Sequence, residues 1–147
     1  MPESIEDMLA GTDLFSRVDR DDLHEIAGWV QLQNFNAGQV VQREGELGTT
    51  LYIIRSGAVD VYQAYGDAEH QQQLASFGEG DFFGEMALLL GRPRSATIVA
   101  SENTECMTIL RSTFQDQSNK EVLWAMLQHV AERLAHADET IGEMHSH

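Results

Sequence analysis

The sequence predicts a mainly β protein with flanking helices, built as an antiparallel β jelly roll (double-stranded β-helix) with N-terminal helices and a C-terminal helix. Apolar residues recur at three- and four-residue steps before about residue 30 and again after residue 118, a period typical of amphipathic helices. Between them, short β-prone runs alternate with turn glycines, which indicates many short antiparallel strands. We therefore expect one domain over 1–147, with helices over about 1–30, a β-barrel over 31–115 and a helix over 118–142.

The first segment predicts short amphipathic helices. Gly11 is expected to interrupt the first of them, and Asp21 or Asp22 is expected to cap the second, because aspartate side chains accept from the free N–H groups of a helix start. The apolar positions that define the helical period are Ile5, Met8, Leu9, Leu14, Phe15, Leu23, Ile26, Ala27 and Val30.

The middle segment predicts strands over 51–54, 58–62, 97–100 and 106–110. These runs are rich in β-branched and aromatic residues, which favour a pleated surface. Segment 66–70, Gly-Asp-Ala-Glu-His, is expected to form an exposed hairpin tip. The glycines that punctuate this region are Gly38, Gly45, Gly48, Gly57, Gly66, Gly78, Gly80, Gly84 and Gly91.

The last segment predicts one long helix. Ser118 or Asn119 is a candidate N-cap, with Glu121 in the first turn. An apolar stripe follows at alternating steps of four and three, which either forms a dimer seam or packs on the barrel. We expect a homodimer through this helix. The stripe consists of Leu123, Leu127, Val130, Leu134, Ala137 and Ile141.

Composition limits the class of protein. The longest apolar run, 86–90, is far shorter than the roughly 20 residues that cross a bilayer, and no basic-then-apolar leader is visible at the N-terminus. Cys106 is the sole cysteine, which excludes an internal disulfide and fits a reducing compartment. We expect a cytoplasmic protein with no membrane contact.

The charge argues against nucleic-acid binding. The formal net charge is −15 and the chain contains only nine Lys and Arg residues, whereas affinity for nucleic acids comes largely from cations that neutralise phosphates. Arg92 and Arg94 are the single close pair. We expect no nucleic-acid partner.

Segment 82–97 combines residues suited to a sugar phosphate. Gly84 permits a sharp bend or a close approach to a ligand, and 85–90 has good helix formers. A helix start presents free N–H groups to an anionic oxygen. Pro93 ends the helix and directs the chain into Arg94, whose guanidinium binds phosphate in a bidentate manner. Glu85 supplies an acceptor for sugar hydroxyls.

The same segment closely resembles the phosphate-binding cassette of the cyclic-nucleotide-binding domain family, in which Phe-Gly-Glu-x-Ala-Leu is followed by a short spacer and Pro-Arg-small-Ala-Thr. Glu85 and Arg94 are nine positions apart, as in that pattern, without an insertion. The resemblance extends over about 14–134, through Ala37-Gly38, Glu44-Gly45-Glu46, 51–54, Ser56-Gly57 and Gly80-Asp81-Phe82.

The resemblance implies a role for each cassette residue. Glu85 accepts the ribose 2′-hydroxyl and Arg94 pairs with the cyclic phosphate, while Gly84 and Met86 are expected to contact the ligand through their backbone. The N–H groups of Ala87 and of Ser95 or Ala96 complete the phosphate site. A hydroxyl at Ser95 is compatible with cAMP and cGMP, and its similarity to bacterial-type cAMP sensors favours cAMP.

The resemblance also implies a base pocket. Val61 and Leu74 are its candidate walls, and the C-terminal helix is expected to act as a lid in which Val130, Arg133 or Leu134 caps the base. No output domain is visible, so we expect a ligand-sensing regulatory module that acts on an unknown effector protein.

Three alternatives stand beside this hypothesis. Glu85 and Arg94 could form a structural ion pair, although such pairs stabilise weakly. The chain could be a scaffold or dimerisation protein that binds no nucleotide. The third alternative is an enzyme that uses a metal ion or a nucleophile. Against it, the histidines lie in helical or terminal segments and on a loop, and no Gly-x-Ser-x-Gly elbow is present. We therefore expect no metal, no cofactor, no catalytic residue and no enzymatic activity.

Overall fold

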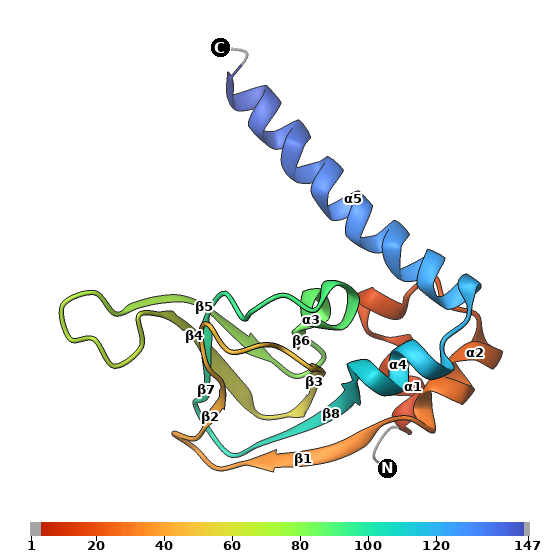
Figure 1. Cartoon of the computed structure of the whole chain (residues 1–147), viewed down its shortest axis with the longest axis horizontal. Helices are drawn as coiled ribbons and strands as arrows, with labels where there is room; N and C mark the ends of the chain where they lie inside the picture. The colour runs from red at the N-terminus through yellow and green to blue at the C-terminus, as the bar shows by residue number, and fades with distance from the viewer. Residues whose placement is uncertain (1–3, 146–147) are drawn as a thin grey trace. The chain divides into compact units, whose positions relative to one another are not determined.

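The computed structural model describes residues 4–145, with side chains described except for Ala87 and 136–145. The chain divides into two compact units (Figure 1). One is Gly28–Gln117, and the other combines Met1–Ala27 with Ser118–His147.

The first unit is an antiparallel jelly roll of two four-stranded sheets, in the orders β1-β8-β3-β6 and β2-β7-β4-β5. This confirms the predicted fold class. The long hairpin between β4 and β5 projects from the body of the unit (Figure 1), and its tip includes the exposed segment 66–70. The strands are β1 Gln31–Phe35, β2 Val40–Gln42, β3 Thr50–Ser56, β4 Ala58–Gln63, β5 Gln72–Gly78, β6 Phe82–Phe83, β7 Thr97–Ala100 and β8 Thr104–Leu110.

The core of this unit lies between the two sheets, because strand alternation directs every second side chain inward. An aromatic group forms part of it: Phe35, Tyr52 and Phe83 are each at most 8% exposed. Packed around these rings are Ile54, Val59, Val61, Ala96, Ile98, Ala100 and Cys106, with Val41, Ala75 and Phe77 at the margin.

The turn between β3 and β4 requires glycine. Gly57 has φ +99°, and a Cβ there would lie 2.6 Å from the carbonyl oxygen of Asn103 and 2.7 Å from Cα of Thr104. The close approach lets Oγ1 of Thr104 bind both the N–H and the carbonyl of Ala58, at 3.1 and 3.0 Å. A short polar side chain thus ties two turns of the barrel together.

The second unit contains α1 Ile5–Ala10, a 3₁₀ turn Asp13–Phe15, α2 Arg20–Ala27 and α5 Lys120–His145. Gly11 ends α1, as predicted. The prediction that Asp21 or Asp22 caps α2 is wrong: the helix begins at Arg20 and both aspartates lie in its first turn. There they still face the positive end of the helix dipole.

The start of α5 agrees with the sequence. Asn119 accepts a hydrogen bond from the N–H of Val122 at 2.8 Å, which is N-cap geometry. Leu123, Leu127 and Leu134 of the predicted stripe are 39%, 41% and 60% exposed, whereas Ala137 and Ile141 lie outside the described side chains. In 4–145, no helix has the length and apolar composition needed to cross a membrane.

One helix of the barrel unit was not predicted. Helix α4, Arg111–Gln117, follows β8 directly and buries a single side chain, Phe114. Its sequence, RSTFQDQ, has no apolar repeat, so periodicity could not reveal it.

Candidate functional site

The candidate site is built on the turn between β6 and β7. Gly84 has φ +88° and joins β6 to helix α3, Glu85–Leu90. The N–H of Leu88 donates to the carbonyl of Gly84 at 3.2 Å. At the other end Gly91, with φ +63°, follows the last helical residue. The two glycines thus delimit a short helix, as the sequence predicted for 85–90.

The backbone of Arg94 is clamped from both sides. Its N–H donates to the carbonyl of Glu46 at 2.7 Å, and its carbonyl accepts from the N–H of Gly45 at 2.8 Å. Leu47 and Pro93 form an adjoining β-bridge. The Glu-Gly-Glu loop after β2 therefore sets the direction in which the arginine side chain leaves the chain.

The guanidinium of Arg94 lies inside the barrel unit. The residue is only 8% exposed, and its Nη2 donates to the carbonyl of Thr50 at 2.7 Å. Its Cζ lies 5.9 Å from the ring centroid of Tyr52, within cation–π range. A Cβ on Gly84 would lie 2.5 Å from Nη1 of Arg94 and 2.6 Å from the Thr50 carbonyl oxygen. The glycine therefore makes the room that this arginine occupies.

The electrostatics of the site are dominated by burial. Burial lowers the pKa of Arg94 from its ordinary value, while Tyr52 and then Glu85 act in the opposite direction. Burial likewise raises the pKa of the Tyr52 phenol, and the charge of Arg94 partly offsets this. Arginine stays protonated in proteins, so the site contains a cation beside a neutral phenol.

The structure brings most predicted cassette residues together. Glu85 and Met86 begin α3, with Ala87 in the same helix, and Met86 is 41% exposed. Ser95 is exposed beside the buried Arg94. Ala96, 7% exposed, belongs to the barrel core. Whether these residues contact a ligand stays a prediction.

The predicted base-pocket residues are more dispersed. Val61 is 8% exposed and packs in the barrel core, whereas Leu74 is 47% exposed. Leu74 lies where β5 has one more residue than β4, since Val61 pairs with Ala75 and Tyr62 with Gln73. Arg133 is exposed on α5, in the other compact unit. Their contacts with a base remain predictions.

Thr50 and Tyr52 were not predicted as site residues. They are two positions apart on β3, so strand alternation directs both side chains to one face. This spacing is visible in the sequence, but nothing local connects it with Arg94, which follows 44 positions after Thr50.

Other chemistry finds little support in the described part of the chain. No group of three or more His, Cys, Asp or Glu side chains there is arranged to hold a metal ion. Cys106 is fully buried, and burial raises the pKa of its thiol to about 12. A nucleophilic cysteine needs the thiolate, which this environment disfavours.

The jelly roll places a buried arginine beside a glycine-bounded helix, an arrangement able to hold a small anion. Residues 32–121 match the family model described as "Cyclic nucleotide-binding domain". The chain belongs to the cyclic nucleotide-binding domain family.

Two curated relatives illustrate the match. Human cGMP-dependent protein kinase 2 is 33% identical over 113 residues, which cover 76% of this chain and 15% of the kinase. The cAMP-dependent protein kinase regulatory subunit of Colletotrichum orbiculare is 32% identical over 110 residues, 75% of this chain and 27% of that subunit. The chain thus spans about a quarter or less of these relatives, and is homologous to the cyclic-nucleotide-binding regions of kinase systems.

Solved structures agree. The N-terminal domain of a transcriptional regulator from Streptomyces coelicolor superposes with a TM-score of 0.80 at 25% identity, covering 91% of this chain and 94% of that one. A cyclic nucleotide-binding-like protein from Brucella abortus gives a TM-score of 0.68 at 29% identity, covering 78% and 97%.

Proposed function

We propose that this chain is a single cyclic-nucleotide-binding domain that senses its ligand in the cytoplasm and performs no catalysis. In this proposal Arg94 pairs with the cyclic phosphate and Glu85 accepts the ribose 2′-hydroxyl. The N–H groups of Ala87 and of Ser95 or Ala96 complete the phosphate site. The observation that carries the proposal is the burial of Arg94, whose guanidinium donates to the carbonyl of Thr50 and lies over the ring of Tyr52.

The buried guanidinium of Arg94 favours an incoming anion. Removing a charge from water is costly unless an opposite charge compensates. The Thr50 carbonyl and the Tyr52 ring orient the guanidinium but do not neutralise it. A phosphate that reaches Arg94 restores charge balance in a partly dry environment, where a charge-assisted bidentate bond is strong.

The alternative role, a structural pair between Glu85 and Arg94, is less well supported. An intimate ion pair favours the charged form of both groups and raises an arginine pKa. Here burial outweighs the effect of Glu85, and the pKa of Arg94 is lowered. Glu85 acts on Arg94 more weakly than burial or Tyr52 does, and we propose that its carboxylate accepts a sugar hydroxyl.

For the identity of the ligand we propose cAMP in preference to cGMP. The support is the resemblance to a cAMP-dependent kinase regulatory subunit, together with Ser95 at the position where the family cassette has a small residue. The similar match to a cGMP-dependent kinase makes cGMP the necessary comparison. The exposed hydroxyl of Ser95 is accessible to either ligand.

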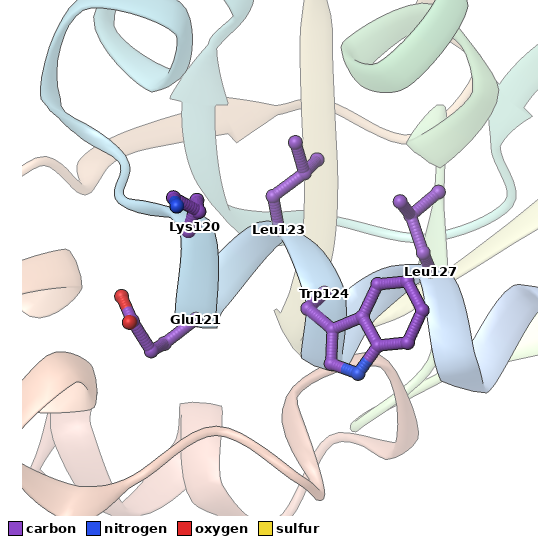
Figure 2. A pocket seen from close by; sticks show the side chains of 5 residues that line it. All are labelled: Lys120, Glu121, Leu123, Trp124 and Leu127. Carbon is purple, nitrogen blue, oxygen red and sulfur yellow. The ribbon is translucent and has the colours of Figure 1, made fainter.

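We also propose that the chain forms a homodimer through α5, with an effector protein that responds to the bound state. Leu123 and Leu127 project to the same side of the helix beside Trp124 (Figure 2), which is 64% exposed. Together with Lys120 and Glu121 these three side chains line an open hollow.

Calorimetry of the nucleotide-stripped protein with cAMP and cGMP tests the binding proposal. Arg94→Ala should weaken binding by about 2–5 kcal/mol, the usual cost of losing one partner of a buried charged contact. Arg92→Ala is the matched control, because it removes the same charge from an exposed position two residues away. Its affinity should stay close to wild type.

Binding that disappears in Arg94→Ala and persists in Arg92→Ala supports the proposal, and the tighter nucleotide is the preferred ligand. A folded wild-type protein that binds neither nucleotide would contradict it and favour the scaffold hypothesis. For the dimer, sedimentation velocity should show a monomer for Leu134→Asp and a dimer for Ala135→Asp, an exposed neighbour one step off the stripe. A wild-type monomer would exclude the dimer.

A further inference from the structure

The guanidinium of Arg94 lies at the end of a column of aromatic rings. The ring of Tyr52, 5.9 Å from Cζ, stacks on Phe83 with centroids 4.9 Å apart and planes 14° from parallel. Phe83 in turn stacks on Phe77 at 6.4 Å and 11°, and Phe35 meets Tyr52 edge-on at 6.2 Å and 62°. The ring of Tyr52 therefore stacks on Phe83 and meets Phe35 at its edge, while Phe77 packs on the far side of the stack through Phe83.

The strand register explains why this column stands where it does. Tyr52 on β3 pairs directly with Phe83 on β6, so their side chains share one face of the sheet. Thr50, two residues earlier on β3, supplies the carbonyl that accepts from Arg94. Gly84 follows Phe83 and leaves space for Nη1. One pair of strands thus provides the ring, the acceptor and the gap.

We infer that Tyr52 is a positioning residue that holds the Arg94 guanidinium in place for the ligand phosphate through a cation–π contact. The inference rests on the proposed function and adds a residue outside the cassette to its phosphate site. A long arginine side chain loses rotamer freedom when it is fixed. A ring that fixes it before the ligand arrives removes that loss from the binding step.

A neutral ring suits this task better than a carboxylate. Burial raises the pKa of Tyr52, so the phenol remains uncharged at neutral pH. It orients the cation without cancelling its charge, and the charge remains available for the phosphate. A carboxylate in the same place would compete with the ligand for the guanidinium.

The first test measures cAMP and cGMP affinities of Tyr52 variants. Tyr52→Leu should bind about 3- to 30-fold more weakly, the range expected for a largely desolvated cation–π contact. Tyr52→Phe keeps the ring and should bind within about twofold of wild type. Phe35→Leu is the matched control, because it removes a ring of the same core that meets Tyr52 only edge-on and leaves the stack of Tyr52 on Phe83 in place; its affinity should stay within about twofold of wild type. Equal losses in Tyr52→Leu and Phe35→Leu would overturn the inference.

A double-mutant cycle shows whether Tyr52 acts through Arg94. In an Arg94→Lys background, Tyr52→Leu should weaken binding much less than it does in the wild-type background, because the planar guanidinium is already absent. The same loss in both backgrounds would assign Tyr52 a role independent of Arg94 and contradict the inference.

A readout without ligand separates this inference from the proposed function. In ¹⁵N-labelled protein, the Nε–Hε signal of Arg94, assigned by its absence in Arg94→Lys, should be shifted upfield by the Tyr52 ring. The shift should persist in Tyr52→Phe and in Phe35→Leu and disappear in Tyr52→Leu. A signal unaffected by Tyr52→Leu would refute the contact between Tyr52 and Arg94, even in a protein that binds cyclic nucleotide. Because the measurement needs no ligand, a protein that binds none would still report on this contact.

Discussion

Replacing Gly84 with alanine tests the idea that the missing side chain makes room for Arg94. Gly80 is a natural control, because its φ of +87° nearly equals the +88° of Gly84. A Cβ at Gly80 would have no neighbour within 4 Å, whereas at Gly84 it would lie 2.5 Å from Nη1 of Arg94 and 2.6 Å from the carbonyl oxygen of Thr50. Gly80→Ala and Gly84→Ala therefore impose the same backbone strain, but only the Cβ of Gly84→Ala collides with neighbouring atoms.

The structure allows the two costs to be separated. A left-handed conformation costs an L-residue roughly 1–2 kcal/mol, and Gly80→Ala should lower the free energy of unfolding by that amount. Gly84→Ala should lower the free energy of unfolding by about 1.5–3 kcal/mol more, because a guanidinium that moves aside gives up its charged hydrogen bond to Thr50. We therefore expect a total of about 2.5–5 kcal/mol for Gly84→Ala, with a loss of nucleotide affinity that Gly80→Ala lacks.

Urea unfolding followed by far-UV circular dichroism measures both variants, and the midpoints are comparable if the slopes agree. Calorimetry with cAMP then gives the affinities. Equal losses of stability in the two variants would show that the collision is relieved at no cost. Unchanged affinity in Gly84→Ala would show that Arg94 does not depend on the space at this glycine.

Three further predictions concern the framework. Thr104→Val should lower the free energy of unfolding by about 1–3 kcal/mol, since it leaves the N–H of Ala58 without its hydroxyl acceptor; an unchanged urea midpoint would contradict this. Asn119→Ala should lower the free energy of unfolding by about 1 kcal/mol, because it removes the cap of α5. A loss of helical circular dichroism without any change in the unfolding midpoint would argue against this expectation. The Cys106 thiol should resist maleimide in the folded protein and react in urea, because burial raises its pKa to about 12 from an ordinary 9.0. Since the unfolded thiol ionises first, its stabilising contribution is complete below about pH 9 and is lost as the pH rises towards 12. The stability difference between wild type and Cys106→Ala should shrink across that window, and a constant difference would refute the assignment.

Local patterns explain what could be predicted. Gly11 and Asn119 mark helix ends through the conformation or hydrogen bonding of their own segment, so short stretches of sequence suffice. The predicted cap at Asp21 or Asp22 failed because the helix already begins at Arg20, and the sequence has an aspartate before that residue as well as two after it. Helix α4 was missed because only Phe114 is buried on it.

The sequence alone predicted the jelly roll, from alternating strand runs and turn glycines along the chain. It also predicted the helix 85–90 and showed the nine-residue step from Glu85 to Arg94, because both depend on neighbours within about a dozen positions. It did not determine what holds Arg94. Thr50, Tyr52 and Gly84 meet the guanidinium only because β3 pairs with β6 in the register that sets Tyr52 opposite Phe83. Strand register arises from how whole sheets pack and close, and a shift by one residue would turn Tyr52 to the opposite face. The cassette residues are close in sequence, whereas tertiary structure decides which residues surround the guanidinium of Arg94.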